Sequence, residues 1–237
     1  MIPLLAAPLL LLAQQTGMKP EETERWSPVP PTVETSEDRP PSDAVRLFDG
    51  RSLAGWVGKD GAPARWTVAD GTLRVTPGTG DITSTEAFGD VQLHVEWRTP
   101  VSDKEGQARS NSGIFLMGLY ELQVLDSHNA RTYVNGQAGS IYKQHAPLVN
   151  ASRPPREWQS YDIVFRAPRF ADGKVVRPAR MTVFHNGVLV QDNAELSGPT
   201  LYIGVPEYKP HAASLPITLQ DHGDLIEYRN IWARRLR

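Results

Sequence analysis

Hydrophobic and polar residues alternate along most of the chain beyond its first forty residues. In the clearest stretch, Val91, Leu93, Val95 and Trp97 alternate with polar residues, which is the two-residue period of a strand with one buried face. The same period predicts strands over 66–68, 72–75, 112–117, 120–125, 161–166, 180–185, 188–191 and 226–233. No stretch of fifteen residues follows the 3.6-residue period of an amphipathic helix.

Two dipeptides between predicted strands indicate tight hairpin turns. Asp70-Gly71 and Asn186-Gly187 each separate two strand-like runs, and both central positions of the favoured two-residue turn need a positive φ. Many short strands joined by such turns are typical of an all-β domain. We therefore predict an antiparallel β-sandwich of the jelly-roll type, with a curved sheet that offers a concave binding face.

The N-terminal region differs from the rest of the chain. Residues 2–13 are almost entirely apolar, a run that is short for a membrane span and suits a secretory signal, which we predict over 1–17. The alternative is an apolar N-terminus with no role in export. Residues 18–44 are rich in proline and poor in residues able to pack, and we predict a disordered linker there. The folded domain is then 45–237.

Composition narrows the function classes. The formal charge is −2 and no long basic block is present, which argues against a nucleic-acid partner. The chain has no cysteine, so disulfides and thiolate chemistry are excluded, and an exported protein of this kind suits the bacterial periplasm or secretion. Dinucleotide, P-loop and HExxH motifs are absent, so nucleotide chemistry and zinc proteolysis are poor hypotheses.

The segment from Tyr120 to Asp126 is the most informative for chemistry. Alternation places Glu121 and Gln123 on one face of the strand, and Asp126 joins them only if a bulge inserts one residue. Two neighbouring carboxyl groups can split their pKa values and act as acid and base. The alternative is that Glu121 and Asp126 are solvated residues on an exposed face, or that Asp126 caps the following turn.

Other polar residues have both a functional and an ordinary interpretation. Asn111 could orient sugar hydroxyls or belong to a turn. Lys143 could stabilise an oxyanion or be a surface lysine. His222, between two aspartates at 221 and 224, could be a base, an oriented acid or a ligand of a hard metal ion, or lie in a polar hairpin. Trp158 with Tyr161 could stack on a sugar, whereas the tryptophans at 66, 97 and 232 are more simply assigned to the core.

The sequence resembles the 3-keto-disaccharide hydrolase family over about residues 45 to 237. The blocks that carry the resemblance are Leu47-Phe48-Asp49-Gly50, Leu53-Ala54-Gly55-Trp56, Asn111-Ser112-Gly113-Ile114-Phe115, Tyr120 through Ser127, Gly139-Ser140-Ile141-Tyr142, Trp158 through Ile163, His185-Asn186-Gly187, Leu219 through Gly223 and Arg229-Asn230-Ile231-Trp232. The resemblance implies a concanavalin-like jelly roll that is usually exported and that acts on an oxidised sugar, a 3-keto-glycoside.

The chemistry implied by this resemblance is cleavage of a glycoside whose carbon 3 is a ketone. It needs a base near carbon 2, a donor or cation on the ketone oxygen and an acid for the leaving group. This reaction needs no nicotinamide cofactor. A divalent metal ion held by carboxylates and His222 is an alternative to Lys143 for stabilising the enolate. The hypothesis assigns Glu121 or His222 as base, Lys143 as enolate stabiliser, Asp126 as proton donor, and Asn111, Gln123, Trp158 and Gln220 as residues that orient the sugar.

Two other functions are compatible with the same fold. A glucanase-type glycoside hydrolase would use two strand carboxylates, about 5–5.5 Å apart in a retaining enzyme, but Gln123 stands where a further carboxylate is expected. A non-catalytic, lectin-like carbohydrate-binding module is the other alternative, because fold alone does not decide activity.

Overall fold

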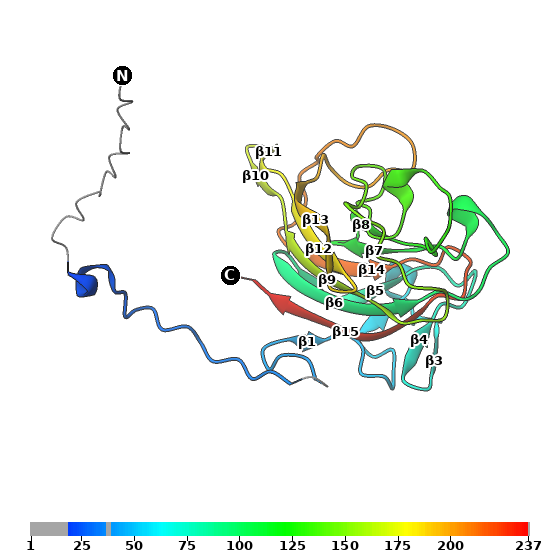
Figure 1. Cartoon of the computed structure of the whole chain (residues 1–237), viewed down its shortest axis with the longest axis horizontal. Helices are drawn as coiled ribbons and strands as arrows, with labels where there is room; N and C mark the ends of the chain where they lie inside the picture. The colour runs from blue at the N-terminus through cyan, green and yellow to red at the C-terminus, as the bar shows by residue number, and fades with distance from the viewer. Residues whose placement is uncertain (1–18, 37–38, 237) are drawn as a thin grey trace, which may run out of the picture.

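The computed structural model describes residues 19–36 and 39–236, so the predicted signal sequence, 1–17, lies outside the described residues. Two antiparallel sheets pack face to face in a jelly-roll β-sandwich, which confirms the predicted fold class (Figure 1). No helix in the described part of the chain is long and apolar enough to cross a membrane. The helical elements are the short 3₁₀ turns η1 (Pro20–Thr23), η2 (Lys59–Gly61), η3 (Gly106–Ala108) and η4 (Val134–Gly136).

The larger sheet has eight strands in the order β13-β12-β9-β6-β15-β4-β3, with β1 also paired to β15. Its strands are β1 (Val45–Arg46), β3 (Thr67–Ala69), β4 (Thr72–Arg74), β6 (Val91–Arg98), β9 (Gln159–Arg166), β12 (Arg180–His185), β13 (Val188–Glu195) and β15 (Glu227–Arg235). The predicted turns at Asp70-Gly71 and Asn186-Gly187 join β3 to β4 and β12 to β13, and all four turn residues have positive φ.

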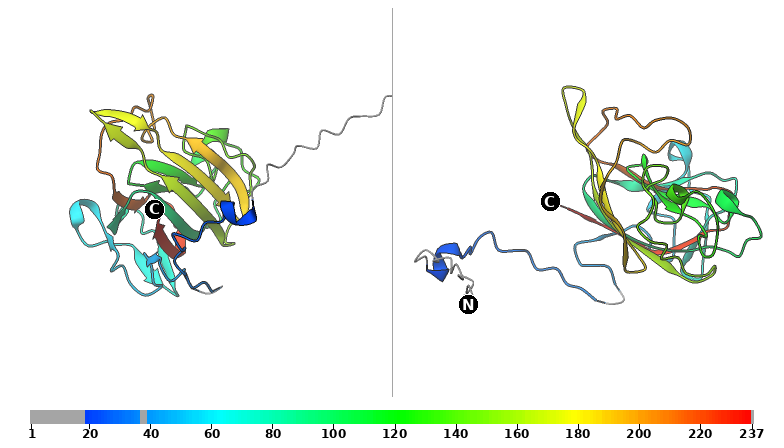
Figure 2. Two further views of the ribbon diagram at one scale, coloured as in Figure 1. Left: turned by 90° about the vertical axis from the view of Figure 1, so that its left-hand side faces the viewer. Right: turned by 45° about the horizontal axis from the view of Figure 1, so that its top comes forward.

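The smaller sheet has five strands in the order β2-β5-β14-β7-β8. Its strands are β2 (Trp56–Val57), β5 (Ile82–Phe88), β7 (Ser112–Leu116), β8 (Tyr120–Val124) and β14 (Leu215–Leu219). A separate hairpin of β10 (Arg169–Ala171) and β11 (Lys174–Arg177) projects beyond the sandwich (Figure 2). The segment 220–226 connects β14 in the smaller sheet to β15 in the larger sheet. The alternative that His222 lies in a polar hairpin is therefore wrong, because this segment crosses between the sheets.

The core lies between the two sheets and follows the alternation of the sequence. On β6, Leu93, Val95 and Trp97 are fully buried, while the intervening polar residues lie on the outer face. On β7 and β8, Ile114 and Leu122 are paired and fully buried. Because side chains alternate across a strand, their neighbours on β7 and β8 must point to the opposite, outer face of the smaller sheet.

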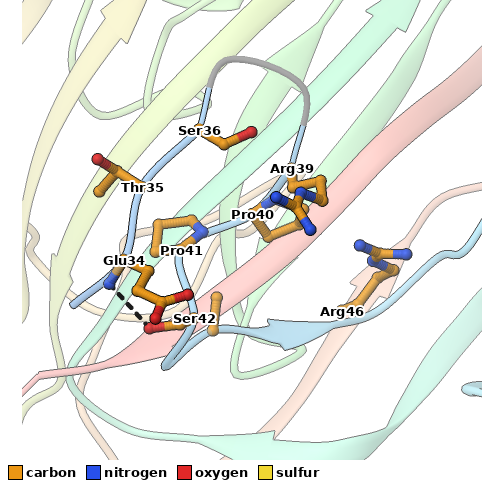
Figure 3. A pocket seen from close by; sticks show the side chains of 9 residues that line it. Glu34, Thr35, Ser36, Arg39, Pro40, Pro41, Ser42 and Arg46 are labelled. Carbon is orange, nitrogen blue, oxygen red and sulfur yellow. Dashed lines mark hydrogen bonds between the residues drawn. The ribbon is translucent and has the colours of Figure 1, made fainter.

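The N-terminal arm leads away from the sandwich as an extended segment (Figures 1 and 2). Its described residues before 37 are exposed except Val33. Nearer the sandwich, the arm forms a shallow pocket of its own, where Ser42 Oγ accepts a hydrogen bond from the backbone N–H of Glu34 at 3.0 Å (Figure 3). No histidine or aspartate lines this pocket among the described residues, and it shares no residue with the cavity described next.

Candidate functional site

A polar cavity of about 270 Å³ lies on the outer face of the smaller sheet. It is built from β7 and β8, from Asn111 just before β7, and from three loops, which contribute Tyr142, the pair Thr200 and Tyr202, and the pair Gln220 and His222. The lining residues are Asn111, Phe115, Glu121, Gln123, Tyr142, Thr200, Tyr202, Gln220 and His222. Five of the residues that the sequence singled out therefore share one cavity: Asn111, Glu121, Gln123, Gln220 and His222.

Strand β8 is the edge of the smaller sheet, and a loop covers that edge. The backbone N–H of Gln123 donates to Ser140 O at 3.0 Å, and the N–H of Tyr142 donates to Glu121 O at 3.2 Å. An uncovered strand edge exposes unpaired backbone groups, and this loop satisfies them. It also brings the Tyr142 ring to the cavity beside Glu121. On the same strand, Glu121 N–H donates to Thr200 Oγ1 at 2.9 Å.

Glu121 is the most perturbed carboxyl group of the cavity. The residue is only 5% exposed. Burial raises the pKa of Glu121 to about 8, and the negative charge of Asp81 adds to the effect. Desolvation disfavours the charged form of a carboxyl group, so Glu121 is mostly protonated at neutral pH yet close to its titration point. A group with a pKa near the working pH can both accept and return a proton.

Asp81 is a second carboxylate near Glu121, and no motif in the sequence marks it. Partial desolvation raises the pKa of this exposed residue, the hydrogen bond from the Asp221 backbone opposes the rise, and the like charge of Asp221 adds to it. Asp81 Oδ1 accepts the backbone N–H of Asp221 at 2.8 Å. Its position just before β5 depends on pairing with β14 across the sheet, which no local pattern reveals.

Gly113 makes room for the Glu121 carboxyl group. A Cβ atom at position 113 would lie 2.6 Å from Glu121 Oε1 and 2.8 Å from Phe115 Cε2. Both distances are shorter than real Cβ atoms adopt. The glycine of the Asn-Ser-Gly block is therefore required by the close approach of the Glu121 side chain and not by a turn, since it lies inside β7.

Three side-chain amides line the cavity and are held in different ways. Both polar atoms of the Asn111 amide form hydrogen bonds: Nδ2 donates to Gln107 O at 2.7 Å, and Oδ1 accepts from Gln123 Nε2 at 3.2 Å. By contrast, the buried Oε1 atoms of Gln123 and Gln220 have no hydrogen-bond partner among the described residues. Buried polar atoms without partners are rare. These two acceptors are suited to the hydroxyl groups of a bound ligand, and Asn111 positions one of them.

The segment 220–224 is held by its aspartates and exposes its histidine. Asp221 accepts hydrogen bonds from the backbone N–H groups of Gly80 and Gly223, each at 3.0 Å. Asp224 accepts from Asn111 N–H at 2.9 Å and from Lys104 Nζ at 2.9 Å. His222 stands between them, exposed and on the lining of the cavity. The two carboxylates thus position the loop, and the imidazole faces the site.

Lys143 is placed at the margin of the cavity and not in its lining. Its ammonium group donates to the carbonyl oxygen of Tyr202 and lies 4.3 Å from the centroid of the Tyr202 ring. The rings of Tyr133 and Tyr142 are 5.8 Å and 5.7 Å from the same nitrogen. The lysine backbone has a positive φ of 59°, uncommon for such a residue. This geometry makes Lys143 a link between two loops of the cavity.

Asp126 lies away from the cavity, in contrast to the hypothesis that it is the proton donor. β7 and β8 pair in regular register up to Val124, where β8 ends, so no bulge occurs within the strand before Asp126. Its carboxylate is 1% exposed and pairs with Arg109 Nε at 2.8 Å. The Asp126 carboxylate is thus held in a buried ion pair and does not line the cavity.

Trp158 is also outside the cavity. The guanidinium groups of Arg98 and Arg229 lie over its ring, at 4.5 Å and 4.1 Å from the centroid. Tyr161, its suggested stacking partner, is fully buried and donates its hydroxyl to Gln123 O at 2.8 Å. Of the tryptophans assigned to the core, those at 66 and 97 are buried, whereas Trp232 stacks on His94 at a centroid distance of 5.2 Å.

Four lining residues were not expected from the sequence: Phe115, Tyr142, Thr200 and Tyr202. Phe115 and Tyr142 belong to sequence blocks that carry the family resemblance, so those blocks could have pointed to them. No sequence pattern marks residues 200–202 as part of a site. Within the part of the chain that the structure describes, no group of three or more histidines and acidic residues is arranged to hold a metal ion.

Comparisons with known proteins agree with this architecture. A family model described as a 3-keto-alpha-glucoside-1,2-lyase-like domain matches residues 43–234. The 3-keto-disaccharide hydrolase of Bacteroides thetaiotaomicron is 26% identical over 156 residues, covering 51% of each protein. The chain therefore matches about half the length of this curated relative.

Two solved structures are similar to this one. A proposed glycosyl hydrolase from Parabacteroides distasonis ATCC 8503 has 46% sequence identity and a TM-score of 0.89, covering 93% of this chain and 98% of that chain. A second proposed glycosyl hydrolase from the same organism has 20% identity and a TM-score of 0.60, covering 82% and 94% of the two chains. The second similarity supports the fold alone.

Proposed function

The chain belongs to the family of 3-keto-α-glucoside-1,2-lyase-like domains, and from this premise and the cavity we propose that it cleaves 3-keto-glycosides. The supporting observation is Glu121, a buried carboxyl group with a pKa raised to about 8, in a cavity whose other polar groups are amides, hydroxyls and one imidazole. The names of the related proteins support a carbohydrate-active enzyme of the hydrolase type.

The chemistry follows from the ketone at carbon 3 of the sugar. The ketone acidifies the hydrogen on carbon 2, and Glu121 as carboxylate removes it to form an enolate. The enolate re-forms the ketone and expels the group on carbon 1, which takes up a proton as it departs. A double bond between carbon 1 and carbon 2 remains in the sugar. Water then adds across this bond, with its hydroxyl on carbon 1 and its proton on carbon 2.

The residues of the cavity have distinct tasks in this proposal. Glu121 holds the proton taken from carbon 2 and returns it during hydration. His222, at the open side, is the second proton-transfer group and serves the leaving group. The free oxygens of Gln123 and Gln220 accept hydrogen bonds from sugar hydroxyls, and Asn111 positions Gln123. We further propose that the protein is exported, as the apolar residues 2–13 indicate.

Direct hydrolysis of an unoxidised glycoside is the second candidate, because Asp81 lies close enough to Glu121 to raise its pKa. A pair of carboxyl groups is what a glycosidase without a keto group requires. The two functions differ in one testable respect: only the first depends on the ketone.

The deciding experiment compares a 3-keto disaccharide with its unoxidised parent, with and without a chelator. Product release and the ultraviolet absorbance of the enone are followed for the wild type, Glu121→Gln and the surface control Glu86→Gln. Cleavage of the keto sugar alone, lowered at least ~100-fold by Glu121→Gln and unaffected by Glu86→Gln, is the expected result. Cleavage of the parent would favour the direct glycosidase, no cleavage of either would favour a binding module, and inhibition by the chelator would add a metal ion to the site.

A further inference from the structure

A second polar pocket, here named the arginine pocket, lies where β4, the end of β6 and the start of β15 meet. Its volume is about 300 Å³, and it shares no residue with the cavity around Glu121. The lining residues are Arg74, Arg98, Thr99, Pro100, Arg156, Leu225 and Glu227.

The arginine pocket has more positive than negative charge. Glu227 accepts a hydrogen bond from Arg74 Nε at 2.8 Å and also pairs with Arg98. The lining thus has one carboxylate, which pairs with Arg74 and Arg98, and three guanidinium groups. Within the described residues, the side chain of Arg156 has no hydrogen-bond or ion-pair partner, and it is exposed. The pocket therefore retains two net positive charges, one of them on a free guanidinium.

Contacts hold the backbone beside Arg156 and the guanidinium group of Arg98 in place. The backbone N–H of Arg156 donates to Thr99 O at 2.8 Å, which fixes the loop before β9 against the end of β6. Arg98 is fixed by Glu227 and by the ring of Trp158, 4.5 Å away. Donors whose geometry is set before binding lose less conformational freedom when a ligand arrives.

The buried hydroxyl group of Thr99 is an independent feature that points to a ligand. The residue is 1% exposed and lines the pocket, and its buried hydroxyl has no hydrogen-bond partner among the described residues. Native proteins satisfy nearly all buried polar groups. An orphaned hydroxyl beside three guanidinium groups is expected where an absent group completes the hydrogen bonding.

We propose that the arginine pocket binds an oxyanion, a carboxylate or sulfate group, carried by a sugar or present as a free ion. Guanidinium groups donate hydrogen bonds and accept none, and their planar fork matches carboxylate and sulfate oxygens. Glu227 already shows that Arg74 and Arg98 bind a carboxylate. Pro100 and Leu225 supply an apolar wall for the carbon skeleton of an organic anion. The site is separate from the proposed catalysis and stands without it.

The test titrates the full chain with sodium sulfate, sodium glucuronate and glucose, at an ionic strength held constant with sodium chloride. Amide chemical shifts of Thr99 and Arg156 are the readout. Saturable shifts with sulfate or glucuronate but not with glucose, weakened at least tenfold by Arg156→Ala and unchanged by the exposed control Arg51→Ala, are expected. Tighter binding of glucuronate than of sulfate would identify an acidic sugar, and equal or weaker binding a free anion. Absence of saturation, or equal affinity in Arg156→Ala, would overturn the proposal.

Thr99→Val separates ligand binding from a structural role of the hydroxyl. Valine has nearly the shape of threonine and removes only the hydroxyl, which has no hydrogen-bond partner among the described residues. We expect the anion affinity to fall three- to tenfold while the melting temperature stays equal or rises. A lower melting temperature with unchanged affinity would mean that the hydroxyl serves the fold, and the pocket would lose this argument. Arg156→Ala remains informative in either case, because that side chain is exposed.

Discussion

Glu121 is buried at a cost to stability that depends on pH. Its pKa in the folded protein is about 8, above the ordinary value of 4.5, so the folded state holds the proton more tightly than the unfolded state. The stability associated with the protonated form is full below pH 4.5 and is lost as pH rises through about 8. For this largely desolvated group the loss is on the order of a few kcal/mol.

Glu121→Gln should therefore stabilise the protein in alkaline solution. The amide is neutral at every pH, so the melting temperature of the variant should match the wild type near pH 5 and exceed it by several degrees near pH 9. Thermal unfolding followed by circular dichroism across this range measures the difference, with Glu86→Gln as the exposed control. A difference that does not change with pH would show that the carboxyl group is not held protonated by burial.

Gly113→Ala should reduce activity by displacing the Glu121 carboxyl group. The added Cβ would lie 2.6 Å from Glu121 Oε1, and the side chain must move because the glycine is inside β7. We expect turnover of the keto substrate to fall at least tenfold. In Gly113→Ala/Glu121→Gln the glycine change should add little further loss, because both changes act through one group. Independent, multiplied losses would contradict the link between the two residues.

Among the elements around the cavity, the loop that carries Thr200 and Tyr202 is held by a small number of hydrogen bonds. Thr200 N–H donates to Leu119 O at 2.8 Å, and Lys143 binds the carbonyl of Tyr202. Apart from these hydrogen bonds the loop is open to solvent, because the side chains of Tyr202, Ile203 and Val205 are highly exposed. A segment with few buried contacts opens at low free-energy cost, so Lys143 is expected to keep Tyr202 at the cavity.

Lys143→Ala tests this positioning role against the enolate-stabilising role. Loss of the loop contact should raise KM several-fold, change kcat by no more than about threefold, and increase proteolytic cleavage between 200 and 205. Arg51→Ala, another exposed basic residue, is the control. If KM and proteolysis stayed unchanged while the rate of the chemical step dropped roughly 100-fold or more, the ammonium group would instead act on the developing oxyanion.

At the scale of the whole molecule, alternation predicted the strands that have one buried face and missed those that do not alternate. β6 and β12 match their predicted ranges, whereas β5 carries Ser84 at a buried position and Thr85 and Glu86 at successive exposed positions, which breaks the alternation. β14 contains Pro216, which weakens a strand pattern. Alternation places Glu121 and Gln123 on one face of β8, as predicted, whereas His222 reaches the cavity from the loop after β14, which alternation does not determine. The ion pair of Asp126 with Arg109 and the place of Asp81 depend on partners far along the chain, and no local pattern determines them.

The arm and the sandwich should be separable at Ser42. Before that residue the described arm buries no side chain, whereas Asp43 pairs with Arg234 at 2.7 Å and β1 pairs with β15. A variant beginning at Ser42 is therefore expected to melt within about 2 °C of the full chain, since surface changes away from such contacts move stability by about 0.5 kcal/mol or less. Its turnover of the keto substrate should be unchanged.

A longer truncation, beginning at Asp49, is the matched comparison. It removes β1 together with Leu47 and Phe48, each 4% exposed, and it deprives Trp56 Nε1 of the Leu47 carbonyl that it binds at 2.8 Å. Burial of two such side chains contributes on the order of 3–6 kcal/mol, a large part of the stability of an ordinary domain. The longer truncation should thus unfold at a much lower temperature or fail to fold. If the variant beginning at Ser42 lost as much stability as the one beginning at Asp49, the arm would be part of the folded unit, and the boundary near residue 45 would have to move toward the N-terminus.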